Sequence, residues 1–185
     1  LGNPSASLTV SPGAILQLYD LGLTNPVART ITMTNARLNA SGSATDTNVV
    51  NGGFQLTGLN TFWCDQANLI VNGPIGGSGS LSFFATDPGT LILNGTNTYP
   101  GDTTVTNGTL GGSGILAGNL VMLGGTNSPG MSIGTFTVNG NTTLAGTTLM
   151  ELNRSLSPNS DRLVVGGTLA FGGTHTLRAG SSVGG

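Results

Sequence analysis

The segment Gly89–Gly114, GTLILNGTNTYPGDTTVTNGTLGGSG, contains one triplet twice. Gly89-Thr90-Leu91 opens the segment, and the same triplet returns towards its end as Gly108-Thr109-Leu110. Runs of Thr, Leu and Ile between Gly and Asn are typical of short β-strands, and a fixed period indicates that one strand lies above its copy in a stack. We therefore expect Leu91 and Leu110 to point into a common core.

A longer repeat surrounds this triplet. Gly52–Trp63, GGFQLTGLNTFW, aligns with Gly89–Pro100, GTLILNGTNTYP, at an offset of 37 residues. The tetrapeptide Gly-Gly-Ser-Gly also occurs at 76–79 and at 111–114, an offset of 35. These landmarks predict that 52–81 recurs as 89–116, with each unit making two coils of about 18–19 residues. Residues 1–51 match the repeat only in composition.

The rest of the chain shows the same pattern of short apolar runs separated by turn-forming residues. Its apolar runs are mostly three to six residues long and are separated by Gly, Asn, Ser or Pro, and no window shows a helical period. Glycine occurs 32 times and glutamate once, which disfavours helices. We predict one all-β domain over 1–185, a parallel β-helix (β-solenoid) of about 18–25 residues per coil and roughly nine coils. An antiparallel β-sandwich is the alternative, because turn signals recur about every 8–12 residues.

Charge excludes several classes of function. Only 6% of the residues are charged, the net charge is −2, and lysine is absent. This composition lacks the basic footprint that nucleic-acid binding or attraction to an anionic membrane surface requires. No apolar run reaches the roughly 18 residues of a membrane span. The basic residues are scattered, at Arg29, Arg37, Arg154, Arg162 and Arg178.

No catalytic, cofactor or metal site is predicted. GMSIG at 130–134 fits the G-x-S-x-G pattern around Ser132, and Asp161 and His175 follow in hydrolase order. That motif requires a strand, a turn and then a helix, whereas a strand pattern follows here. Carboxylates are too dispersed for a lyase or a calcium site, and one cysteine and one histidine exclude a zinc site in practice. The single Cys64 permits no intrachain disulfide and is interpreted as a small buried apolar residue.

Three surface features receive structural interpretations. The Thr-x-Thr pairs are irregularly spaced, so outward β-propensity explains them better than ice binding does. Asparagine in the Asn-x-Thr/Ser motifs is expected mainly at the corners of coils rather than as a glycosylation acceptor. The nine aromatic residues are too sparse along the sequence to predict a carbohydrate platform.

The segment 89–110 resembles the passenger-associated transport repeat, also called the autotransporter-associated β-strand repeat. The resemblance rests on six landmarks together with Thr103-Thr104-Val105, while Pro100-Gly101-Asp102 departs from the family pattern. It extends over about 52–176 and implies a bacterial, exported, right-handed β-helical segment that is associated with transport and with scaffold; it does not imply catalysis. The six landmarks are Gly89, Leu91, Asn97, Tyr99, Gly108 and Leu110.

The sequence therefore favours a non-enzymatic, structural extracellular protein. We expect a rigid β-solenoid building block of a surface stalk or a self-assembling fibre, formed by end-to-end stacking of copies, with the tail at 178–185 held by a neighbouring copy. The location would be extracellular or the bacterial cell surface, and the chain shows no signal-peptide pattern at Leu1. The alternative is an adhesin or glycan-binding module with ligand contacts at Asp20–Asn25 or Thr45–Asn51.

Overall fold

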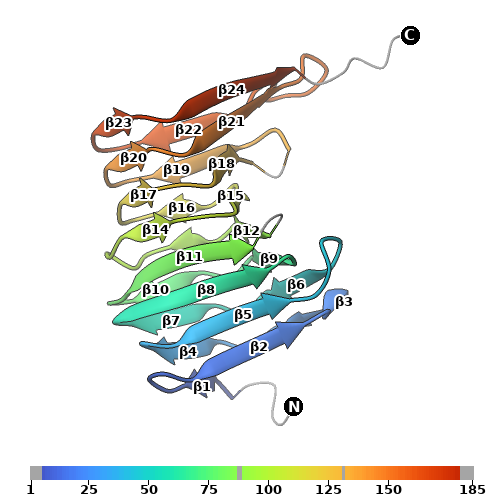
Figure 1. Ribbon diagram of the computed structural model, residues 1–185, viewed down its shortest axis with the longest axis vertical. Coiled ribbons are helices and arrows are strands. Elements are labelled where there is room, and N and C mark those ends of the chain that lie inside the picture. The colour runs from blue at the N-terminus through green and yellow to red at the C-terminus, as the bar shows by residue number, and fades with distance from the viewer. Residues whose placement is uncertain (1–5, 87–88, 131, 180–185) are drawn as a thin grey trace.

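The computed structural model describes residues 6–86, 89–130 and 132–179, and these form a parallel β-solenoid. Every pair of neighbouring strands is parallel, so the predicted fold class is confirmed and the antiparallel sandwich is wrong. Figure 1 shows the coils as layers that rise from the N-terminal to the C-terminal end. The described residues contain eight coils of three strands each, against the roughly nine that we expected.

Each coil contributes one strand to each of three faces. We name each face by its first and last strands. The β2–β23 face consists of β2 (Ile15–Tyr19), β5 (Arg37–Ser41), β8 (Leu59–Asp65), β11 (Ser80–Thr86), β14 (Thr103–Val105), β17 (Leu120–Met122), β20 (Thr142–Leu144) and β23 (Leu169–Phe171). The β3–β24 face consists of β3 (Gly22–Val27), β6 (Thr47–Val50), β9 (Asn68–Val71), β12 (Thr90–Leu93), β15 (Thr109–Gly112), β18 (Thr126–Pro129), β21 (Thr147–Leu152) and β24 (Thr174–Ala179).

The third, β1–β22 face is divided into two four-stranded sheets. The first contains β1 (Leu8–Val10), β4 (Ile31–Thr34), β7 (Phe54–Thr57) and β10 (Ile75–Gly77). The second contains β13 (Thr96–Asn97), β16 (Ile115–Leu116), β19 (Thr135–Val138) and β22 (Arg162–Val165). A backbone hydrogen bond of 2.8 Å from the N–H of Thr98 to the carbonyl oxygen of Ile75 joins the two sheets.

The core is a set of columns of inward side chains. Alternate residues of each strand point inward, and parallel pairing places each above its partner in the preceding coil. Phe62 lies beside Phe83 and Phe83 beside Val105, and all three side chains are fully buried. Because burying a large apolar side chain contributes about 1.5–3 kcal/mol, each coil stabilises its two neighbours.

Coil length varies more than we predicted. The shortest coil has 17 residues, from Thr103 to its partner Leu120. The longest has 27 residues, from Thr147 to its partner Thr174. This spread exceeds the predicted range at both of its limits. The longest coil contains an excursion at 153–160, which an antiparallel bridge between Leu152 and Ser160 closes. The strands stay in register because such insertions leave the wall at a corner.

The two copies of the long repeat do not lie above one another. Phe54 of the first copy lies in β7, whereas Leu91 of the second lies in β12, on another face. The offset between the copies therefore corresponds to five strands rather than to two whole coils. Both copies contain the same kind of corner, at Gly77 in the first and at Gly112 in the second. These glycines have positive φ angles of 93° and 120°. A Cβ atom on either glycine would lie 2.2 Å from a backbone oxygen of the preceding coil.

Asparagine side chains continue the stacking at the corners. Asn72 donates a 2.8 Å hydrogen bond from Nδ2 to Oδ1 of Asn51, and Asn94 donates one of 2.9 Å to Oδ1 of Asn72. Oδ1 of Asn94 accepts from the backbone N–H of Ser113 at 3.2 Å. The corner role that we predicted is confirmed for Asn94. Asn39, which lies within β5, is an exception.

Candidate functional site at the ends of the solenoid

The two Gly-Thr-Leu triplets lie one above the other in adjacent coils, as their repetition in the sequence predicted. Thr90 pairs with Thr109 and Leu91 with Leu110, and both leucines are fully buried. Gly108 has a φ of +88°, and a Cβ there would lie 2.4 Å from the Cβ of Ala85. A glycine is therefore required at Gly108 both by backbone conformation and by the approach of the neighbouring coil.

Asn97 connects three successive coils. Its Oδ1 accepts a hydrogen bond from the backbone N–H of Ile75 at 3.1 Å, in the coil before. Its Nδ2 donates to the carbonyl oxygens of Gly95 at 3.0 Å and of Ile115 at 3.1 Å, the latter in the coil after. Asn97 thus pairs backbone groups where the two sheets of the β1–β22 face meet.

Tyr99 completes the same corner. Its ring is buried, and its hydroxyl shares a hydrogen bond with the hydroxyl of Thr103. Burial raises the pKa of Tyr99 above its ordinary value, and the bond to Thr103 opposes this only in part. The structure therefore makes Tyr99 a core residue whose hydroxyl joins β14 to the segment after β13 within one coil.

The three residues of the hydrolase-like pattern do not form a hydrogen-bonded triad. Oδ1 of Asp161 accepts from the backbone N–H of Gly134 at 3.0 Å, and Oδ2 accepts from the N–H of Glu151 at 2.7 Å. Both of these bonds hold the end of the excursion at 153–160 against the neighbouring strands of the solenoid. His175 lies on β24 with its ring edge-on to Phe171, at 4.9 Å between ring centroids, and Ser132 is exposed.

Within the described ranges, no three side chains of His, Cys, Asp or Glu form a group that could hold a metal ion. The same residues contain no helix that is long and apolar enough to cross a membrane.

Cys64 is a core residue, as its sequence context predicted. Its side chain is fully buried between Ala40 and Ala85 in the inward column, and its Sγ donates to the carbonyl oxygen of Thr90 at 3.4 Å. Burial raises the pKa of the Cys64 thiol to about 12, against 9.0 for an ordinary thiol, and a backbone hydrogen bond with Leu69 lowers it only in part.

Cys64 is expected to make the protein less stable in alkali. Between pH 9 and about 12 the unfolded thiol ionises while the folded thiol stays protonated. The stability that this protonation supports is therefore complete below pH 9 and is lost as the pH rises, at up to about 1.4 kcal/mol per pH unit. We expect Cys64→Ala to flatten the decline, as measured by urea unfolding at pH 8, 9 and 10. Equal slopes for the variant and the original chain would contradict this assignment.

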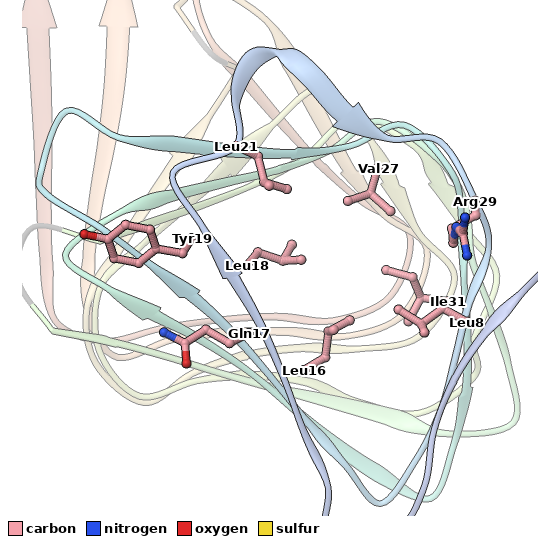
Figure 2. A pocket seen from close by; sticks show the side chains of 9 residues that line it. All are labelled: Leu8, Leu16, Gln17, Leu18, Tyr19, Leu21, Val27, Arg29 and Ile31. Carbon is pink, nitrogen blue, oxygen red and sulfur yellow. The ribbon is translucent and has the colours of Figure 1, made fainter. Parts of the chain in front are cut away.

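The N-terminal end of the described solenoid is formed by β1, β2 and β3. An apolar pocket of about 370 Å³ lies inside this coil, and no other described strand pairs with its outer edge. Figure 2 shows Leu16 and Leu18 on one side of β2 and Gln17 and Tyr19 on the other. The complete lining is Leu8, Leu16, Gln17, Leu18, Tyr19, Leu21, Val27, Arg29 and Ile31.

The C-terminal end, formed by β22, β23 and β24, is the counterpart. Its pocket has a volume of about 300 Å³, and Leu144, Met150 and Leu169 are among its lining residues. Phe171 continues the inward column of Leu144, yet 67% of its surface is exposed because no described coil lies above it. Leu177 is exposed for the same reason, since it pairs with Met150.

The segments proposed for ligand contacts in the adhesin alternative are not free loops. Asp20–Asn25 enters β3 at Gly22, and Thr45–Asn51 contains β6. β3 and β6 pair with each other on the β3–β24 face, with a register shift between Gly22 and Val27. Most of the tail at 178–185, which we expected to contact a neighbouring copy, lies outside the described residues.

A scan against protein-family models matches the passenger-associated-transport-repeat at residues 84–111. The chain carries a passenger-associated transport repeat. The match contains both Gly-Thr-Leu triplets and extends from the end of β11 into β15. Searches of curated proteins and of solved structures gave no match. The passenger repeat and the solenoid together indicate an autotransporter passenger-like structural or adhesive domain, and the repeat implies a secreted or surface location.

Proposed function

We propose that this passenger-like chain is a non-enzymatic structural element outside the cell, and that copies of it stack end to end into a stalk or fibre. One observation supports the proposal most directly. The first and last coils of the described residues each present unpaired strand edges around an apolar pocket.

The stacking step would repeat what the chain already does internally. At six of the seven steps between the described coils, one coil pairs its three strands in parallel with those of the next, and at the step from β10 to β13 the other two strands pair. A second copy placed on the C-terminal end would set its β1, β2 and β3 on β22, β23 and β24. This contact joins two different surfaces and does not close on itself, so it generates a linear polymer.

The strands at the N-terminal end lack most features that prevent edge-to-edge pairing, whereas β22 and β24 at the C-terminal end contain Arg162 and Arg178. Soluble proteins protect such edges with charges, especially lysine, and with proline. β1 and β2 contain no charged residue and no proline. β3 contains Pro26, which has no N–H to donate, so we expect β1 and β2 to provide most of the hydrogen bonds at this joint.

Association should therefore increase with protein concentration. In sedimentation-velocity experiments from 1 to about 300 μM, a range that spans the usual affinities of specific contacts, we expect the weight-average mass to rise continuously. An open series of oligomers is expected, because each added copy exposes another free end. A chain that stays monomeric over this range, or one that stops at a closed dimer, would contradict end-to-end stacking.

A further inference from the structure

Four outward side chains gather on the β2–β23 face, although they are distant in sequence. The register places Asn39 of β5 beside Trp63 of β8, and Trp63 beside Phe84 of β11. Arg37 is two residues from Asn39 on the same strand, and its guanidinium carbon lies 4.6 Å from the centroid of the Trp63 ring. We call Arg37, Asn39, Trp63 and Phe84 the Trp63 cluster.

The Trp63 cluster combines exposed aromatic surface with a fixed cation. Phe84 is 41% exposed although it lies within a β-strand, and Trp63 is half-buried. Stacking of Arg37 on the indole is a cation–π contact, which restricts the rotamers of both side chains. Trp63 and Phe84 are register partners in adjacent coils, whose strands are about 4.8 Å apart along the rod, so both aromatic residues belong to one outward column.

Three polar atoms of the Trp63 cluster are shielded from solvent and have no hydrogen-bond partner. They are Nε of Arg37, Nε1 of Trp63 and Oδ1 of Asn39. The whole Asn39 side chain is only 8% exposed, which is unlike the corner asparagines that pair with backbone or with one another. Leaving such groups unpaired costs about 1–3 kcal/mol each, so a ligand that pairs with them gains affinity.

A hydroxyl group complements this set of atoms. Once the stacked Arg37 side chain moves and opens these buried atoms, a hydroxyl can accept hydrogen bonds from the N–H groups of Arg37 and Trp63 and donate one to Oδ1 of Asn39. Aromatic rings beside such polar groups suit a molecule with an apolar face and a hydroxylated edge. Asp65 is the nearest carboxylate along the outward side of β8, and its Oδ1 accepts from the hydroxyl of Thr86 at 3.1 Å. The surroundings of Trp63 thus carry one cation and one anion, which favours a neutral ligand.

We propose that the Trp63 cluster binds a neutral oligosaccharide. A sugar ring packs on Phe84, and hydroxyl groups of the ligand pair with Arg37, Asn39 and Trp63 after the Arg37 side chain shifts off the indole. Gln17 of β2 precedes Asn39 in the same outward column, so the site extends over the first four coils, about 14 Å along the rod. End-to-end stacking leaves this face free. A fibre would therefore display the site once per copy and would bind a polysaccharide with higher avidity than a single chain does.

Fluorescence provides a selective test, because Trp63 is the only tryptophan of the chain. We would titrate the protein with neutral oligosaccharides built from glucose, xylose and N-acetylglucosamine, while exciting only tryptophan. A saturable shift in emission with at least one series is expected. Phe84→Ser and Asn39→Ala should each weaken binding by about tenfold or more, which equals about 1.4 kcal/mol.

Leu59→Ser is the matched control, because Leu59 lies on the same strand as Trp63 and is 59% exposed but lies outside the Trp63 cluster. Its affinity should equal that of the original chain, and far-ultraviolet circular dichroism would verify the fold of every variant. The proposal fails if no neutral oligosaccharide changes the emission, or if Phe84→Ser and Asn39→Ala bind normally. Binding of acidic glycans alone, or a self-association that Phe84→Ser abolishes, would assign the face to another partner.

Discussion

Replacing Gly108 by alanine is expected to destabilise the protein by about 2–5 kcal/mol, the sum of a backbone and a packing contribution. Its positive φ of 88° adds about 1–2 kcal/mol of backbone strain for a residue with a side chain. The new Cβ would also lie 2.4 Å from the Cβ of Ala85 and 2.9 Å from the carbonyl oxygen of Gly89. Neither neighbour can withdraw without shifting a strand, and overpacking of this kind costs about 1–3 kcal/mol. Equilibrium unfolding in urea would measure the loss.

Gly13→Ala separates the two causes. Gly13 has a similar φ of +74°, but nothing lies within 4 Å of the position that its Cβ would occupy. We expect this variant to lose only the backbone contribution of about 1–2 kcal/mol. If Gly108→Ala were no more destabilising than Gly13→Ala, the neighbouring coil would not be packed against Gly108 as the structure shows.

Replacing Phe171 by aspartate is expected to abolish end-to-end association. Phe171 is 67% exposed in the single chain, so the change should alter the stability of the monomer little. In the stacked state its side chain would be covered by the apolar N-terminal coil, where an unpaired carboxylate is costly. We expect the association constant from sedimentation equilibrium to fall at least 100-fold, about 2.7 kcal/mol.

Leu123→Asp is the control for this variant. Leu123 is 60% exposed and follows β17, away from both ends of the solenoid. It introduces the same charge into the chain, so it should leave association unchanged apart from the effect of net charge. Equal association by the two variants would show that the C-terminal coil is not the contact surface.

The sequence predicts the solenoid because successive coils carry the same residue types at the same positions. Leu91 and Leu110 occupy the same position in successive coils, and the identical residues around them reveal the period directly. The offset between Gly52 and Gly89 was misleading, because strand and corner chemistry is shared by all three faces. A strand therefore resembles a strand on another face as closely as its partner above it.

The outward face could not be predicted in the same way. Trp63 and Phe84 become neighbours because the coil that separates them has one particular length, which depends on the lengths of its corner segments. Coil length differs between the short coil that ends at Leu120 and the long one that ends at Thr174, so no fixed period locates such pairs. Asp161 is similar, because its backbone partners Gly134 and Glu151 meet only once the excursion at 153–160 has closed.

X-ray fibre diffraction from aligned, concentrated protein tests the central claim most directly. If copies stack coil on coil, the strands lie perpendicular to the fibre axis throughout, including across the joints between copies. We therefore predict long unbranched filaments and a strong reflection at about 4.8 Å along the fibre axis. The absence of filaments, or a reflection of about 4.8 Å perpendicular to the axis, would contradict this account of the protein.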